Sequence, residues 1–87
     1  ESHRLDLGHD ALKAHDWQRA LDLADEHRAL HANTQLSLEF ENIAIRALVG
    51  LGRLDDARVR LDAMKAAYPH SLYEDSLERL LRSAGPR

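Results

Sequence analysis

Two histidines, His27 and His31, have the type and spacing that most directly suggest chemistry. They are four residues apart, and in a helix this spacing places two imidazoles on one face, where they can share a metal ion. No HExxH motif accompanies them, so a third ligand would have to be an Asp or Glu from elsewhere in the fold. In the competing interpretation His27 is partly buried as a packing residue and His31 is exposed. A metal-binding domain is kept as an alternative function, while the main prediction includes no metal and no cofactor.

The hydroxyl and carboxylate residues form no recognisable catalytic pattern. No serine lies in the G-x-S-x-G sequence of a nucleophile elbow, and no glycine-rich loop is present to cradle a phosphate. The carboxylates are spread along amphipathic segments, where they are typical of a solvated helix face. The sequence therefore predicts a protein that is not an enzyme. The serines fall in capping or surface contexts: Ser2, Ser37, Ser71, Ser76 and Ser83.

The composition is that of a small helical domain. Of the 87 residues, 44% are hydrophobic and 31% charged, and there are only two prolines and four glycines, which argues against disorder. Alanine, leucine, arginine and aspartate dominate and β-branched residues are few, which favours an all-α chain. The first residue is Glu1 rather than Met, so we expect a segment of a larger protein.

The charge distribution narrows the possible partners. The net charge is −3, with nine acidic and four basic residues in 1–43 and six acidic and eight basic residues in 44–87, or −5 and +2. An acidic domain is a poor nucleic-acid binder, although its basic half can meet an acidic partner. No apolar run approaches the roughly 18 residues of a membrane span, so we expect no membrane insertion. With no cysteine, the compartment stays open between cytoplasm and periplasm.

Apolar residues at intervals of three and four predict five helices. They cover about 2–14, 17–31, 35–51, 54–68 and 71–83, with a connector at 32–35 and a frayed tail at 84–87. The third carries two adjacent apolar stripes, so we expect it to be packed on more than one side at the centre of the domain. Gly52 suits the left-handed position after this helix, Pro69 ends the fourth, and Ser71 with Glu74 has the capping-box pattern of the fifth.

The chain resembles itself at an offset of 37 residues. Leu12–Leu21 aligns with Val49–Arg58, and in both a helix ends, a short turn follows, and a large apolar residue precedes an alanine by three. Periods of this size are typical of stacked helical hairpins. The better-preserved copy is Ala44–Pro69, where a helix, a glycine turn and a second helix form one antiparallel hairpin.

These features resemble the tetratricopeptide repeat, a helical hairpin of about 34 residues. The second copy matches the family pattern at Gly52, Leu54, Ala57, Leu61 and Pro69, and the first matches it at Leu7, Gly8, Trp17 and Ala20. The chain departs from the pattern at Ile45, Ala24 and Ala32, and in a loop about three residues longer than the family's. Part of the chain also looks like the repeat modules of many bacterial multidomain proteins. The resemblance implies a right-handed stack of two antiparallel hairpins (repeat one about 2–31, repeat two about 35–69) and a C-terminal capping helix at 71–83.

In that family the first helix of each hairpin lines a concave groove, and Asn, Lys and Arg often hold a peptide backbone or a terminal carboxylate there. The resemblance therefore implies a groove lined by Leu5, His9, Leu12, Lys13, Glu39, Asn42, Arg46 and Val49. Lys13, Asn42 and Arg46 are the polar candidates, because a planar guanidinium suits a carboxylate. The competing interpretation is that Lys13 and Arg46 belong to a solvated face.

Two main functions stay open at this point. One is a protein-interaction module, a scaffold that binds a peptide or partner segment in its groove. The other is a structural assembly or capping domain that forms homo-oligomers or ends a longer helical array. The last helix discriminates between them: Tyr73, Leu77, Leu80 and Leu81 fold back on the fourth helix in a cap, whereas exposure of some of them marks an interface.

Overall fold

The computed structural model describes residues 2–30 and 37–84, with residues 2–4 and 30 described by their backbone alone. Within these ranges five helices follow one another: α1 (Ser2–Lys13), α2 (Trp17–Leu30), α3 (Ser37–Gly50), α4 (Leu54–Ala67) and α5 (Glu74–Ala84). No strand occurs within the described ranges. The predicted all-α class is therefore confirmed. The predicted connector at 32–35 and most of the predicted tail lie outside the described residues, and Ala84 is the last residue of α5.

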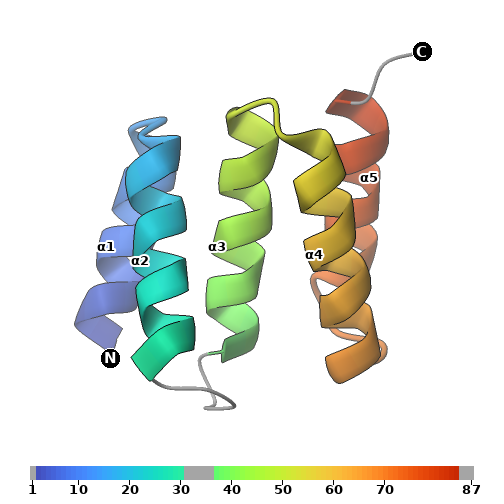
Figure 1. The fold of residues 1–87 in the computed structure, drawn as a ribbon, viewed down its shortest axis with the longest axis horizontal. Coiled ribbons are helices and arrows are strands. Elements are labelled where there is room, and N and C mark those ends of the chain that lie inside the picture. The colour runs from blue at the N-terminus through green and yellow to red at the C-terminus, as the bar shows by residue number, and fades with distance from the viewer. Residues whose placement is uncertain (1, 31–36, 85–87) are drawn as a thin grey trace.

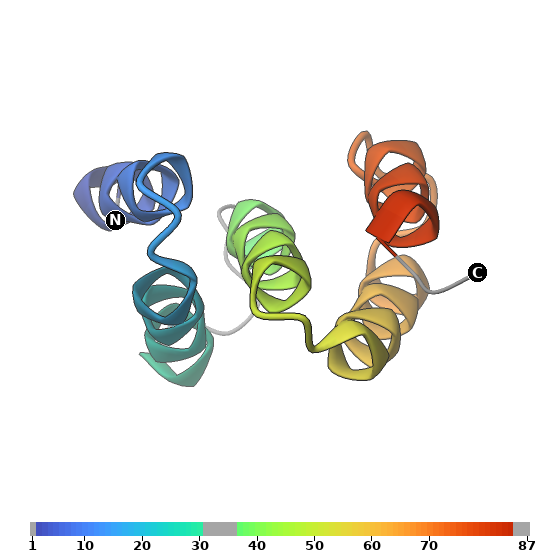
Figure 2. The same cartoon turned by 90° about the horizontal axis from the view of Figure 1, so that it is seen from above.

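The helices run alternately up and down, and α3 lies in the middle of the molecule (Figure 1). It contacts each of the other four helices, whereas α1 and α5 do not contact each other. Seen along the helix axes, α1 and α5 lie on one side of α3, and α2 and α4 lie on the other (Figure 2). The prediction that the third helix is the central packed element is thus confirmed.

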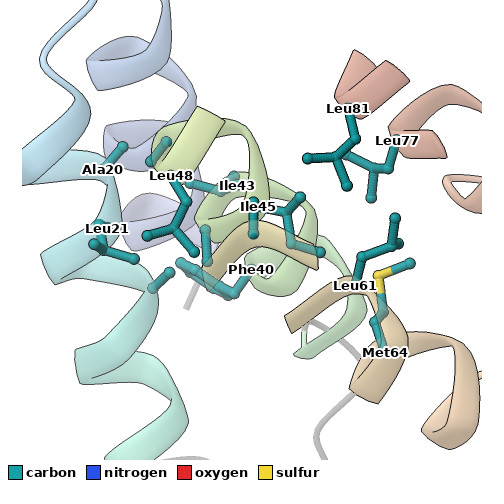
Figure 3. Packing of buried hydrophobic residues seen from close by; sticks show 14 of the residues in the cluster. Ala20, Leu21, Phe40, Ile43, Ile45, Leu48, Leu61, Met64, Leu77 and Leu81 are labelled. Carbon is teal, nitrogen blue, oxygen red and sulfur yellow. The ribbon is translucent and has the colours of Figure 1, made fainter. Parts of the chain in front are cut away.

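The core is built on α3, whose two apolar stripes meet different neighbours. Phe40, Ile43 and Ile45 of this helix are fully buried, and leucines from the flanking helices close around them (Figure 3). On the α4 and α5 side the core is completed by Leu61 and Leu77, both inaccessible to solvent. Burying a side chain of this size contributes about 1.5–3 kcal/mol, so α3 supplies the largest share of the apolar stabilisation.

The turn between α1 and α2 closes α1 with two backbone hydrogen bonds. The amide of His15 donates to the carbonyl of Leu12 at 3.1 Å, and the amide of Asp16 donates to the carbonyl of Ala11 at 2.8 Å. His15 has a φ of 59°, so it occupies the left-handed position of a Schellman motif.

The turn between α3 and α4 repeats this motif 37 residues later. The amide of Gly52 donates to the carbonyl of Val49 at 3.0 Å, and that of Arg53 donates to the carbonyl of Leu48 at 2.9 Å. Gly52 has a φ of 78°, which confirms its predicted left-handed conformation. The two hairpins therefore share their turn chemistry, with a histidine in the first where the second has glycine.

The predicted capping box at the start of the last helix is wrong. Helix α5 begins at Glu74, not at residue 71. In a capping box the amide of Glu74 would donate to the hydroxyl of Ser71, but here it donates to the backbone carbonyl of Ser71 at 3.3 Å. The Ser71 hydroxyl oxygen is buried and has no hydrogen-bond partner in the described part of the chain. The preceding residue, His70, is left-handed with a φ of 62°.

The apolar face of α5 folds back on the rest of the domain. Leu77 and Leu81 are buried, and Tyr73 and Leu80 are partly buried against the core. The α4–α5 connection leaves one large apolar side chain, Leu72, 80% exposed. By its leucines α5 has the packing expected of a cap, with Leu80 at the edge of the surface described next.

Candidate binding face between α1, α3 and α5

A hollow opens between the helices near the carboxyl ends of α1, α3 and α5. Four apolar side chains, one glycine and one arginine line it: Leu12, Trp17, Arg46, Val49, Gly50 and Leu80. We call this surface the α1–α5 hollow. Because α1 and α5 do not contact each other, α3 forms its floor. Binding pockets are usually lined by apolar side chains with a few polar or charged groups among them, as this hollow is.

Trp17 is the largest side chain of the hollow, and it packs directly on the backbone of α3. A Cβ atom added to Gly50 would lie 2.2 Å from the indole of Trp17, so only glycine permits this approach. The ring of His15 stacks on the indole, with centroids 5.0 Å apart and planes inclined by 17°. Trp17 thus joins the first hairpin to the end of α3.

Arg46 supplies the charge of the hollow. Its Nε donates to Oδ1 of Asn42 at 3.0 Å, and one Nη donates to Oγ of Ser76 on α5 at 3.0 Å. Asn42 is only 5% exposed, so its carbonyl group holds the guanidinium from the protein side. Both partners are neutral, and within the described residues no carboxylate pairs with Arg46.

Arg60, on the α2 and α4 side of α3, differs from Arg46 because carboxylates of the domain neutralise its charge. Its side chain is 12% exposed and forms ion pairs with Glu41 at 2.8 Å and with Asp25 at 2.7 Å. These contacts join α2, α3 and α4. They also hold the pKa of Arg60 above its ordinary value against the opposing effect of burial. Arg46, by contrast, keeps donor capacity for an external anion.

A second polar contact joins α3 to the α4–α5 connection beside Arg46. The hydroxyl of Tyr73 donates to a carboxylate oxygen of Glu39. Burial, and next the hydrogen bond to Glu39, raise the pKa of Tyr73 to about 12, so the phenol stays protonated and remains a donor at neutral pH. The carboxylate of Glu39 is therefore held by Tyr73, the residue that precedes α5.

The structure distributes the eight predicted groove residues over different environments. Leu12, Arg46 and Val49 line the α1–α5 hollow. On the same helix as Arg46, Asn42 accepts a hydrogen bond from Arg46 and Glu39 accepts one from Tyr73. Leu5 is half-buried against the core. The remaining two, His9 and Lys13, border a shallow depression formed by α1 alone.

Trp17, Ser76 and Leu80 were missed as parts of this face. The sequence places Trp17 on the second helix of its hairpin, which the repeat pattern assigns to the outer surface. Ser76 and Leu80 belong to α5, which the sequence leaves open between a cap and an assembly interface and does not assign to the groove. In the structure α5 lies on the same side of α3 as α1 (Figure 2), which brings Ser76 and Leu80 to this face.

No group of three potential metal ligands occurs in the described part of the chain. His31 lies outside the described residues, so the predicted histidine pair stays a prediction. His27 is 1% exposed and stacks on Phe40, with ring centroids 4.1 Å apart, so its imidazole takes a packing position in the core. The described helices also include none long and apolar enough to cross a membrane.

No family model, curated protein or solved structure matches this chain. Its membership of the tetratricopeptide repeats therefore stays a prediction. The structure does repeat one feature at an offset of 37 residues, the Schellman turn.

Proposed function

We propose that this domain is a non-catalytic protein-interaction module that binds a peptide or partner segment across α1, α3 and α5. The observation that carries the proposal is the α1–α5 hollow, where four apolar side chains surround a half-buried arginine that lacks a carboxylate in the described residues. A tetratricopeptide-like stack of hairpins is part of the same proposal, since such a stack leaves its inner helices available.

The chemistry of the hollow specifies its occupant. An apolar side chain fits against Trp17, Leu12, Val49 and Leu80, because its burial there removes apolar surface from water on both partners. A carboxylate close to that side chain meets Arg46, which uses only two of its five N–H donors within the described residues. The preferred ligand is thus a segment that combines an apolar side chain with a neighbouring acidic group.

The size of the face sets the expected strength of binding. One hollow between three helices offers less area than the roughly 800 Å² per partner of a standard protein interface. We therefore expect weak affinity for the isolated domain, and stronger binding where neighbouring repeats extend the surface.

Trp17 makes the proposal testable, because it is the only tryptophan of the chain and it lines the hollow. Peptides selected from a phage-displayed random library are titrated into the domain while indole fluorescence is recorded. We expect saturable changes in emission with peptides that combine apolar and acidic residues. Selection of peptides that bind without affecting Trp17 emission would contradict the proposal.

Two matched variants separate the hollow from the rest of the surface. Val49→Asp places a charge on its apolar wall, and we expect it to weaken peptide binding about tenfold or more, which corresponds to about 1.4 kcal/mol. Val59→Asp makes the same change at a side chain of α4 that is 70% exposed, and we expect it to leave binding unchanged. Circular dichroism of both variants verifies that the helical content is retained. Equal effects of the two variants would count against the hollow as the binding site.

A further inference from the structure

The exposed face of α1 carries an ordered row of charges. Asp6, Asp10 and Lys13 are separated by four and three residues, so they lie along one side of the helix. All three are exposed, and none of their side chains forms a hydrogen bond or an ion pair within the described residues. We call this row the α1 stripe; its order is negative, negative, positive.

The exposed face of α5 carries the complementary row. Asp75, Arg79 and Arg82 are separated by four and three residues and are likewise exposed. They too form no ion pair in the described part of the chain, unlike the neighbouring Glu78, which binds Arg58 and Lys65. We call this row the α5 stripe; its order is negative, positive, positive.

The two stripes cannot meet within one molecule. Helices α1 and α5 lie at opposite ends of the long axis, separated by α3 (Figures 1 and 2), and the molecule extends 38 Å in that direction. The two stripes are, however, equal in length, and each charge of one faces an opposite charge of the other when the two helices run antiparallel. A stripe that spans eight residues on each helix covers about two turns.

We propose that copies of this chain associate end to end, with the α1 stripe of one copy packed antiparallel against the α5 stripe of the next. Only the antiparallel orientation matches all the charges. The parallel orientation would place Asp6 against Asp75 and Lys13 against Arg82. The pairs of the antiparallel arrangement are Asp6–Arg82, Asp10–Arg79 and Lys13–Asp75.

Leu72 gives this arrangement its apolar contact. It precedes Asp75 by three residues and is 80% exposed. In the antiparallel register it therefore extends past Lys13 to the α1–α2 turn of the neighbouring copy, where His15 stacks on Trp17. An isolated exposed leucine beside a charged stripe is thereby covered in the assembly.

The contact is heterologous, since it joins two different surfaces and leaves one stripe unused at each end. Neighbouring copies are related by a half-turn about the long axis, and the assembly grows linearly. The inference goes beyond the proposed peptide binding and does not depend on it, because the stripes lie on the exposed faces of α1 and α5 and the hollow lies between these helices.

Sedimentation velocity on the full 87-residue chain tests the proposal. At about 20 mM NaCl, where charges are weakly screened, we expect the average mass to rise above the monomer mass of 9.9 kDa as the protein concentration increases toward about 1 mM. At about 500 mM NaCl we expect the monomer alone. A monomer at about 1 mM protein in low salt, or association that resists salt, would overturn the proposal.

A charge exchange tests the specific register. We expect D6K/D10K and R79E/R82E each to be monomeric when alone. In either variant the α1 stripe of one copy would repel the α5 stripe of the next copy, because two of the three facing pairs then carry like charges. An equimolar mixture of the two variants should assemble again. The positively charged α1 stripe of D6K/D10K is complementary to the negatively charged α5 stripe of R79E/R82E. The unaltered α5 stripe of the first variant is likewise complementary to the unaltered α1 stripe of the second.

A control variant with the same change in net charge separates register from total charge. D22K/D55K alters exposed positions of α2 and α4 outside both stripes, and we expect it to associate like the parent chain. Loss of association in this control, or no recovery in the mixture, would show that the stripes do not form the contact.

Discussion

At the scale of the residue, the close contact between Trp17 and Gly50 illustrates what a sequence can and cannot reveal. The tryptophan was recognisable as a packing residue from its place in an amphipathic helix. Its need for a glycine on α3 was not, because that need arises from a contact between two hairpins and leaves no periodic signal. The role of Gly52 was predictable, since a left-handed helix end is a local property of the chain.

We expect Gly50→Ala to destabilise the domain by about 1–3 kcal/mol, although alanine is the better helix former. The added methyl group would lie 2.2 Å from the indole of Trp17, and a rigid ring in a packed interface has little room to move. Urea unfolding followed by circular dichroism measures the effect.

A second background identifies the cause. In a Trp17→Leu chain, which carries at this position the residue found 37 places later at Leu54, the clash is relieved. There we expect Gly50→Ala to become neutral or stabilising by up to about 1 kcal/mol. The same cost in both backgrounds would show that Trp17 is not the obstacle.

The core makes a separate residue-scale prediction. Leu61 is inaccessible to solvent, and we expect Leu61→Ala to cost about 2–5 kcal/mol through lost burial and the cavity it leaves. Val59, two residues away and 70% exposed, provides the control, since Val59→Ala should change the free energy of unfolding by less than about 0.5 kcal/mol. Chemical denaturation of both variants tests the contrast, and similar costs would place the core elsewhere.

At the scale of the element, α5 is held by charge as well as by leucines. Glu78 accepts two hydrogen bonds from Arg58, at 3.0 and 3.1 Å, and one from Lys65 at 2.6 Å. The hydrogen bonds from Arg58 and then Lys65 lower the pKa of Glu78 from its ordinary value to about 2. These contacts join α5 to α4, while Ser76 of α5 and Tyr73, the residue before it, form hydrogen bonds with α3.

The direction of this pKa shift determines the pH dependence. Because the carboxyl group is more acidic in the folded chain, its contribution is complete above the ordinary pKa of 4.5 and disappears as the pH falls toward about 2. We expect Glu78→Gln to cost about 1 kcal/mol at pH 7, a modest value since the side chain is 24% exposed. The difference from the parent should vanish near pH 2 in thermal melts recorded across this range.

Asp56→Asn is the matched control, because its ion pair with Arg53 spans a single turn between two exposed side chains. It should have a smaller effect at pH 7 than Glu78→Gln. A pH-independent difference between Glu78→Gln and the parent chain would contradict the role given to the carboxylate.

The elements also separate what sequence reasoning achieves from what it misses. The five helices follow from the spacing of apolar residues, which is a local property. The start of α5 was predicted three residues early, because the capping-box pattern at Ser71 is present while the backbone carbonyl takes the amide of Glu74 instead. The residues before the helix, among them left-handed His70, thus form a turn in place of the capping box that the sequence motif predicts.

At the scale of the whole molecule, the repeated turn and the central α3 explain the architecture, and the candidate site depends on where α5 is placed. Arg46 was predicted from its helix face. Its hydrogen bond to Ser76, and the participation of Leu80, could not be predicted, because both residues come from a helix 30 or more residues away. Contacts of that range are set by packing, which periodicity does not encode.

The central claim is that the α1–α5 hollow binds a peptide segment. Its most direct test is chemical-shift mapping of the ¹⁵N-labelled domain with a library-selected peptide that contains apolar and acidic residues. We expect the largest perturbations at Leu12, Arg46, Val49 and Leu80, together with the indole N–H of Trp17. Perturbations confined to the exposed faces of α2 and α4 would contradict the claim.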